Sequence, residues 1–204
     1  MIAVFDFDRT LINKDSLFGF YKIMDAENRF FTLKRYILLM AAVAYKLKLF
    51  SNTQLKKIGV LLFLKGKSKH EIDLRCAEYA KSLLLNDIYN SAFCTLKDKG
   101  LDCIVVSAGY LEYLCHVLPK EKVYGSSLKY AGGKVVGVQE NLYSKNKVDK
   151  LHKLGMERCE VLFTDSFADK PLMDIAKCVF LVKDGRVISK TGSCDLINSK
   201  WITQ

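Results

Sequence analysis

The chain has 204 residues, half of them hydrophobic, which is enough to bury the core of one ordinary domain or of a core with a modest insertion. The net charge of +10 favours anionic partners such as phosphorylated small molecules, nucleic acid or a membrane surface. The lysines are spread along the chain without a dense basic tract, which is typical of a solvated basic surface. The longest apolar run, residues 36–45, is well short of the ~20 residues needed to span a bilayer.

The seven cysteines indicate neither a disulfide framework nor a zinc site, because their number is odd and no Cys-x-x-Cys spacing occurs. Cys103, Cys159 and Cys178 lie in or beside apolar, strand-like runs, so we expect them to be small core residues. This usage suits a reducing compartment. The N-terminal residues lead directly into a predicted strand rather than a signal peptide, so we expect a cytoplasmic protein.

The predicted elements begin with a buried strand over residues 2–7, followed by a long helical segment. Helices are expected to start at residues 15–16, at residues 51–53 and at Ser68, which has Glu71 three positions later in a capping-box spacing. The apolar and basic stretches between these points have helical spacing, so about four helices are predicted over residues 15–85. A further helix over residues 86–99 is expected to stop at Gly100.

After Gly100 the pattern alternates between strands and helices. Strands are predicted over residues 102–106, 160–164 and 178–182, with a last short strand after a turn at residues 184–185, a β-hairpin within 123–138, and helices ending near residue 118 and over 147–154 and 169–177. This order predicts an α/β fold with a Rossmann-like, doubly wound, mostly parallel sheet. We expect a core domain of residues 1–14 and 86–204 and an inserted, all-helical cap domain of residues 15–85.

Polar side chains follow three of the predicted strands. Asp6, Ser107 and Asp165 each stand at the end of an apolar run, and ligands bind outside the carboxyl ends of strands in such sheets. Asp8 lies two residues after Asp6, so both carboxylates can face one point. Their repulsion would be relieved by a hard cation such as Mg²⁺, which prefers oxygen ligands. Asp169, four residues after Asp165, can approach the same metal.

These groups are suited to phosphoryl transfer. A carboxylate can attack phosphorus to give an aspartyl-phosphate, and a second carboxyl can protonate the leaving alkoxide and later deprotonate the attacking water. Mg²⁺ would take a phosphoryl oxygen directly. Ser107 and Lys147 could hold the remaining oxygens and balance the developing charge.

As a set, these residues resemble the four motifs of the haloacid dehalogenase superfamily of phosphatases. The motifs are Asp-Phe-Asp-Arg-Thr at residues 6–10, Ser107, Lys147, and Asp-Ser-Phe-Ala-Asp at residues 165–169, in the family's order and spacing. The helical segment directly after the first motif and the hairpin before the lysine look most like the phosphoserine-phosphatase-like branch.

The resemblance implies a role for each catalytic residue. Asp6 would be the nucleophile and a metal ligand, and Asp8 the general acid/base whose backbone carbonyl also ligates the metal. Asp165 would ligate Mg²⁺, with Asp169 supporting it. A second aspartate at the position of Asp8 favours phosphatase over dehalogenase chemistry, because a leaving alkoxide must be protonated whereas a halide need not be.

The remaining implied roles concern the substrate. Thr10 and Ser107 would hydrogen-bond the nucleophile region and the phosphoryl group, and Lys147 would neutralise charge on Asp6 and the phosphate. The predicted substrate-binding residues are Ser107, Ala108, Gly109, Lys147 and Asp15. Asp15 falls where the branch has a carboxylate that contacts the amine of an amino-acid phosphate, although it is more simply a helix N-cap.

Three positions depart from the family pattern or leave a choice. Arg9 stands where the family most often has glycine, and we expect its side chain to point to solvent rather than over the phosphate entrance. Thr164 replaces the usual glycine before the metal aspartate but removes no ligand. Lys145 is a rival to Lys147, and we favour Lys147 because it begins a predicted helix, as the family's lysine does.

The leading prediction is an Mg²⁺-dependent phosphatase acting on a small phosphorylated metabolite. One alternative is a lipid-linked phosphatase acting at the membrane surface on a phosphatidylglycerophosphate-like substrate, because the apolar run 36–45 is flanked by Lys34, Arg35, Lys46 and Lys48. Another is a non-catalytic phosphate-ligand binding module. Nucleic-acid binding is motivated only by charge, since no recognised motif appears. The sequence determines neither the substrate nor the oligomeric state.

Overall fold

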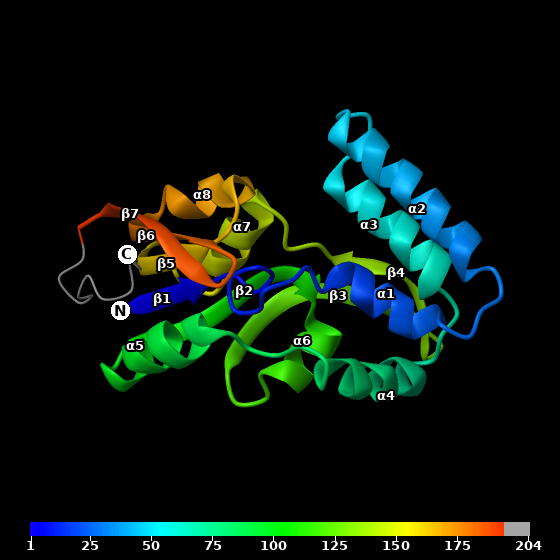
Figure 1. Ribbon diagram of the computed structural model, residues 1–204, viewed down its shortest axis with the longest axis horizontal. Coiled ribbons are helices and arrows are strands. Elements are labelled where there is room, and N and C mark those ends of the chain that lie inside the picture. Colours follow the sequence, from blue (N-terminus) through cyan, green and yellow to red (C-terminus); the bar gives the residue numbers. More distant parts are fainter. Residues whose placement is uncertain (194–204) are drawn as a thin grey trace.

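The computed structural model describes residues 1–193. Within this part of the chain, seven strands form one sheet in the order β4-β3-β2-β1-β5-β6-β7 (Figure 1). The strands are β1 (Ile2–Phe5), β2 (Asp102–Tyr110), β3 (Lys122–Ala131), β4 (Lys134–Glu140), β5 (Cys159–Thr164), β6 (Ala176–Lys183) and β7 (Arg186–Gly192). The α-helices are α1 (Leu17–Asp25), α2 (Phe31–Lys46), α3 (Asn52–Phe63), α4 (Lys69–Ala80), α5 (Cys94–Asp98), α6 (Leu111–Val117), α7 (Lys145–Lys153) and α8 (Lys170–Met173).

The centre of the sheet is parallel and its two edges are antiparallel. β1 pairs in parallel with both β2 and β5, β2 with β3, and β5 with β6, whereas β4 and β7 run antiparallel to β3 and β6. This confirms the predicted mostly parallel α/β sheet. The chain leaves β1 towards β2 on one side and later returns to β5 on the other, so the strand order reverses beside β1, where such folds bind ligands.

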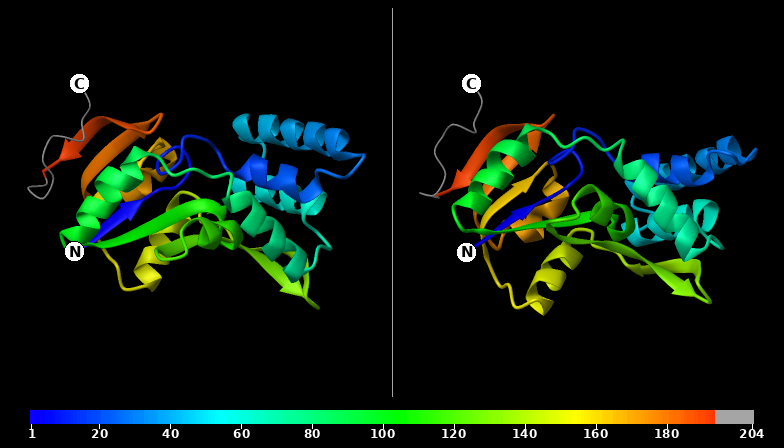
Figure 2. Two further views of the ribbon diagram at one scale, coloured as in Figure 1. Left: turned by 60° about the horizontal axis from the view of Figure 1, so that its bottom comes forward. Right: turned by 90° about the horizontal axis from the view of Figure 1, so that it is seen from below.

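Alternating side chains of β1 pack into two separate cores, one on each face of the sheet. Ala3 and Phe5 belong to a large cluster that includes Phe93 and Leu96 from the helical segment before β2. Val4 belongs to a smaller cluster with residues of α7 and α8. Strands covered by helices on both faces become nearly continuous apolar runs, which explains the sequence of β1. Figure 2 shows α5 and α7 on opposite sides of the sheet.

The four helices predicted over residues 15–85 are present as α1, α2, α3 and α4, here called the cap helices. They lie beyond the carboxyl end of the central strand β1 (Figure 1). Ser51 caps α3 through a complete capping box with Gln54, and Ser68 accepts from the Glu71 amide at the start of α4. The division into a core and a cap domain remains a proposal.

The predicted hairpin is confirmed as β3 and β4, and it reaches the cap helices. Gly66 donates its amide to the Val135 carbonyl at 2.9 Å, and Ser68 forms an isolated bridge with Lys134. α3 packs directly along β4. The hairpin therefore supports the cap as well as extending the sheet.

The strand predicted over residues 2–7 ends at Phe5 in the structure. Two further element predictions differ from the structure. The helix predicted over residues 169–177 is present but shorter, because α8 ends at Met173 and β6 already begins at Ala176. The strand predicted to end at residue 106 continues to Tyr110 as β2, with an irregular register after Val106. Both differences arise because pairing with neighbouring strands overrides local preference.

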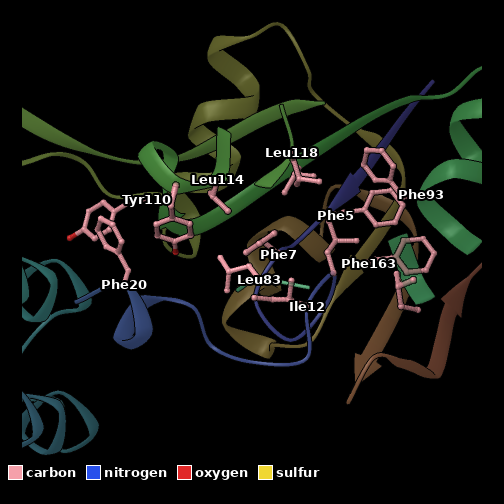
Figure 3. Close-up of a cluster of buried hydrophobic side chains, with 14 of the residues drawn as sticks. Phe5, Phe7, Ile12, Phe20, Leu83, Phe93, Tyr110, Leu114, Leu118 and Phe163 are labelled. Carbon is pink, nitrogen blue, oxygen red and sulfur yellow. The ribbon is translucent and has the colours of Figure 1, made fainter. Parts of the chain in front are cut away.

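One hydrophobic cluster, rich in aromatic side chains, extends from the sheet to the cap helices. Phe5 stacks on Phe163 with ring centroids 4.7 Å apart, and Phe163 stacks on Phe180 at 4.6 Å. Figure 3 shows Phe5, Phe7, Leu114, Tyr110 and Phe20 following one another from β1 towards α1. Cys103, Cys159 and Cys178 are buried as predicted, and Cys194 lies outside the described residues. None of the described helices is long and apolar enough to cross a membrane.

Candidate active site

Asp6 is held at the carboxyl end of β1 by its own backbone. Its amide donates to the Phe163 carbonyl of β5 at 2.9 Å, which continues the parallel pairing one residue beyond the strand. The next turn closes on the Phe7 carbonyl, which accepts from the amides of Thr10 and Leu11. Arg9 adopts a positive φ of 56° in this turn, a conformation that favours glycine. This accounts for the glycine that the family most often has there.

Lys147 joins the first and last motifs. Its ammonium group donates to Asp6 Oδ1 at 2.9 Å and to Asp169 Oδ2 at 2.7 Å. Thr164 Oγ1 also donates to Asp169 Oδ2, at 2.9 Å. Lys147 and Asp169 are each 3% exposed, whereas Lys145 is exposed at the start of α7. The structure therefore supports Lys147 over Lys145 as the lysine of the site.

The electrostatics of this cluster favour a cation. Burial raises the pKa of Asp6 to about 7, against the lowering effect of Lys147. Burial lowers the pKa of Lys147, but Asp6 and Asp169 outweigh this effect and raise it above its ordinary value. Burial also raises the pKa of Asp165, which faces the opposing charge of Arg9. One ammonium group thus bonds two buried carboxylates, Asp6 and Asp169, an imbalance that an added divalent ion would offset.

The structure does not place all four predicted metal ligands in the same way. These ligands are Asp6, Asp8, Asp165 and Asp169. Within residues 1–193 no three His, Cys, Asp or Glu side chains are grouped so that they could hold a metal ion on their own. Asp169 Oδ2 is occupied by Lys147 and Thr164. Asp6 and Asp165 are nevertheless hard oxygen donors with raised pKa values in a site short of positive charge. These donors fit Mg²⁺ provided that a backbone carbonyl, water or substrate oxygens complete the coordination.

Asp8 points towards the start of the cap. Its Oδ1 accepts from the Ser16 amide at 2.8 Å, at the N-terminus of α1. Burial raises the pKa of Asp8 to about 6, and the negative charge of Asp15 adds to the effect. A carboxyl that titrates near neutrality can both donate and accept a proton. Asp15 Oδ1 accepts from the Leu17 amide at 3.0 Å, but the N-cap position of α1 is Ser16, so Asp15 is not the N-cap predicted as its alternative role.

The predicted phosphate-binding residues Ser107, Ala108 and Gly109 lie within β2. Ser107 Oγ accepts from the Gly109 amide at 2.9 Å. A side chain at Gly109 would collide with Tyr113, whose hydroxyl lies 2.4 Å from the position of an added Cβ. Thr10 Oγ1 is buried without a hydrogen-bond partner among the described residues, so its predicted contact with the phosphoryl group stays a prediction.

A cavity of about 480 Å³ adjoins these groups. Its polar lining consists of Arg9, Asp15 and Lys56. The rest is mostly apolar and comes from the cap helices: Leu17, Phe18, Tyr21, Leu38, Leu39, Ala42 and Leu55. Arg9 is exposed, in keeping with the expectation that it points to solvent. It also lines this cavity, and its charge acts on Asp165, so it lies beside the entrance to the site.

Comparison with known protein families identifies the chain. The family model described as haloacid dehalogenase-like hydrolase matches residues 3–174, which include all the motif residues above. The chain belongs to the haloacid dehalogenase-like hydrolases. None of the curated proteins matches it in sequence.

Solved structures of similar fold extend over most of this haloacid dehalogenase-like hydrolase. A protein of unknown function from Bordetella pertussis has a TM-score of 0.71 at 17% identity, covering 85% of each chain. A phosphoserine phosphohydrolase-like protein from Francisella tularensis has a TM-score of 0.66 at 19% identity, covering 88% of this chain and 85% of its own. A phospho-aspartyl intermediate analogue of phosphoserine phosphatase has a TM-score of 0.61 at 21% identity, covering 89% and 87%. At these identities the likeness shows a common fold.

Sequence reasoning about this hydrolase missed Lys56. This residue of α3 is 3% exposed, and its ammonium group donates to the Ala108 carbonyl and, at 2.7 Å, to Ser126 Oγ. Burial lowers the pKa of Lys56 to about 7, opposed in part by Asp8. The sequence pattern could have indicated only that Lys56, unlike Lys57, lies on the inward face of an amphipathic helix. The pattern does not predict which groups Lys56 contacts.

Proposed function

We propose that the protein is a phosphoric monoester hydrolase that cleaves a small phosphomonoester through an aspartyl-phosphate on Asp6. The observation that carries this proposal is the bridge from Lys147 to Asp6 and Asp169, which joins the family motifs at the strand ends. Proteins of similar fold include phosphoserine phosphatases and a cytosolic 5'-nucleotidase IIIB bound to cytidine, the latter with a TM-score of 0.58 at 17% identity. The names of these proteins, phosphatase and nucleotidase, are consistent with hydrolysis of a phosphomonoester.

In the proposed first step a carboxylate oxygen of Asp6 attacks phosphorus, and the bond from phosphorus to the leaving alkoxide breaks. Asp8 gives its proton to that alkoxide, which leaves as an alcohol. In the second step Asp8 takes a proton from water, the water oxygen attacks phosphorus, and Asp6 is released together with inorganic phosphate. The pKa of Asp8, raised to about 6, supports its use in both directions.

Lys147, Ser107 and the amides near Gly109 would hold the phosphoryl oxygens. Lys147 already bonds Asp6, so it can keep that carboxylate ionised and oriented while charge develops on the phosphoryl group. Asp6, Asp165 and the backbone carbonyl of Asp8 would hold Mg²⁺, and Asp169 would support the site through Lys147. When bound, the metal supplies charge stabilisation to a phosphoryl oxygen.

The test is phosphate release from p-nitrophenyl phosphate, with and without EDTA, by wild-type protein and by Asp6→Asn. We expect activity that requires Mg²⁺, returns when Mg²⁺ is added after EDTA, and is lost in Asp6→Asn. Asp98→Asn is the matched control, because Asp98 is exposed on α5 away from the strand ends. Activity that survives both EDTA and Asp6→Asn would overturn the proposed mechanism.

A second candidate is a phosphatase for lipid-linked phosphomonoesters, and the largely apolar cavity of about 480 Å³ favours it. Its polar residues Arg9, Asp15 and Lys56 lie towards the phosphate site, while Phe18, Leu38 and Leu39 could cover an apolar leaving group. The test is a series of alkyl phosphates of increasing chain length. A kcat/KM that rises several-fold per two added methylenes favours the lipid substrate, and a flat series favours a small polar metabolite.

A further inference from the structure

The excess positive charge of the protein lies entirely in one stretch of the sequence. From Asn28 to His70 the chain contains no aspartate or glutamate. It contains ten lysines and arginines there: Arg29, Lys34, Arg35, Lys46, Lys48, Lys56, Lys57, Lys65, Lys67 and Lys69. The rest of the chain holds 22 basic and 22 acidic residues and is neutral. No dense basic tract marks this stretch, because its net charge comes from the lack of aspartate and glutamate. The lysines are spread along the chain as described above, but the net charge is concentrated in residues 28–70.

Helix α2, within this stretch, carries an exposed apolar stripe on its outer face. The stripe consists of Leu33, Tyr36, Ile37, Met40, Val43 and Leu47, which recur at helical spacing and are between 45% and 70% exposed. On the inner face of the same helix, Leu38 and Ala41 are buried, and α2 packs along α3. α2 is therefore apolar on two sides, and only one of them is covered. A contiguous exposed apolar patch rimmed by polar residues is typical of an interaction site.

Cations without acidic partners surround this stripe. Arg29 and Arg35 lie at its N-terminal end, and Lys46 and Lys48 lie at its C-terminal end. None of these four forms an ion pair with any of residues 1–193. Lys34, by contrast, is bound to Asp25 at 2.9 Å. The unpaired cations are thus placed at both ends of the stripe, available to an anionic partner.

We propose that the outer stripe of α2 docks on an anionic lipid surface, with its apolar side chains in the headgroup region and the flanking cations on lipid phosphates. A second copy of this chain is a less favourable partner for the stripe. Two cationic surfaces without aspartate or glutamate would then face each other and repel. An apolar stripe flanked by lysines and arginines is the pattern of a helix that lies in a membrane interface. The inference rests on α2 alone and not on the proposed phosphatase activity.

The position of α2 permits this contact. It is an outermost element in Figure 1 and lies apart from the sheet in both views of Figure 2. Leu49 and Phe50, which follow it, are also exposed, at 71% and 37%. At 16 residues, α2 is about 24 Å long and is suited to lie along a surface. Leu39, exposed on α2, also lines the cavity beside the catalytic groups, so a docked protein would hold that cavity close to the lipid.

The test is cosedimentation of the full chain with vesicles of phosphatidylcholine alone or mixed with equal phosphatidylglycerol. We expect binding to the mixed vesicles that weakens as salt is raised, and much weaker binding to phosphatidylcholine alone. The Ile37→Glu/Met40→Glu variant should reduce binding about ten-fold or more, because it places two anions in the centre of the stripe. The matched control is Leu74→Glu/Leu84→Glu, which makes the same change at exposed leucines outside the stripe.

The fold of each variant is checked by its melting temperature and by its p-nitrophenyl phosphate activity without vesicles. The proposal is overturned if wild-type protein does not bind mixed vesicles at low salt, or if the stripe variant binds as tightly as the control. It is also overturned if sedimentation velocity shows a wild-type oligomer that the stripe variant dissociates without any vesicle binding, since the stripe would then be covered by a second copy. If the stripe variant fails to fold, a wild-type protein that does not bind mixed vesicles at low salt still overturns the proposal.

Discussion

The ammonium group of Lys56, on cap helix α3, donates to the carbonyl oxygen of Ala108 in β2. The same group donates to Ser126 Oγ on β3 at 2.7 Å, and this hydroxyl in turn donates to the Ala108 carbonyl at 2.8 Å. Ala108 follows Ser107, the predicted phosphate ligand. A side chain of the cap therefore fixes the strand end on which the substrate phosphate would rest, and it does so at the edge of the apolar cavity.

We expect Lys56→Met to lower kcat/KM for p-nitrophenyl phosphate by roughly ten- to a hundred-fold, because small displacements of positioning groups cost this much. At pH 7 stability should not fall, since methionine fills a similar volume without a buried charge. Lys57→Met, at the exposed neighbouring position, is the control and should behave as wild type. Steady-state kinetics and urea unfolding measure the two effects. An unchanged kcat/KM would show that Lys56 does not position β2.

Lys56 also predicts a pH dependence of stability. Its pKa is about 7 in the folded chain, against an ordinary value of 10.5. Between these two values the unfolded chain binds more protons, so the contribution of Lys56 to the free energy of unfolding rises with pH. Below pH 7 the full cost of burying the ammonium group is present. The difference in unfolding free energy between wild type and Lys56→Met should therefore shift towards wild type from pH 7 to pH 10, by up to about 1.4 kcal/mol per pH unit.

Lys147→Met should lower both the phosphatase activity and the free energy of unfolding. It removes the only ammonium group that contacts Asp6 and Asp169 in the described structure, and leaves two buried carboxylates unpaired. Removing one partner of a buried ion pair costs about 3–5 kcal/mol, and removing one transition-state donor costs about 10²–10³ in kcat. Urea unfolding and phosphatase assays measure these losses. Lys145→Met is the control; if it proves the more damaging of the two, the assignment of the lysine is wrong.

Asp8→Asn should discriminate between leaving groups. The variant cannot donate a proton, so hydrolysis of an alkyl phosphate should fall by roughly 10²–10⁴-fold. Formation of the aspartyl-phosphate from p-nitrophenyl phosphate should fall much less, because nitrophenolate leaves without protonation. Rapid-quench measurement of the nitrophenolate burst separates this first step from hydrolysis. Equal losses for both substrates in the first step would exclude Asp8 as the general acid.

Phe163→Ala should destabilise the fold without touching the proposed chemistry. Phe163 is fully buried and stacks between Phe5 and Phe180. Removing a buried phenyl ring costs about 3–5 kcal/mol in lost transfer energy and cavity formation. Chemical denaturation measures this loss. Phe167→Ala is the control, because Phe167 is 75% exposed and its removal should cost little.

Local patterns predicted much of the fold and the residues of the candidate site. Asp6, Ser107 and Asp165 follow apolar runs, and the carboxyl ends of parallel strands meet at one edge of a sheet, so the spacing of the motifs predicted that they lie at the same edge. The helix starts at Ser51 and Ser68 were equally local, since capping involves only the next three residues. The helix predicted over 169–177 marks a limit of local patterns. It ends early, at Met173, because pairing of β6 with β5 takes residues from 176 onwards into the sheet.

The alternation of strands and helices, the four motifs and the lack of acidic residues over 28–70 can be derived from the sequence, since each is a property of nearby residues or of composition. The three-dimensional arrangement was needed to establish which face of α2 is covered, which lysine reaches Asp6, and where Lys56 and Arg9 lie. Periodicity reports that a helix has an apolar face but not which neighbour packs against it. That choice depends on contacts between segments far apart in the chain, such as α3 with β2 or α7 with β1.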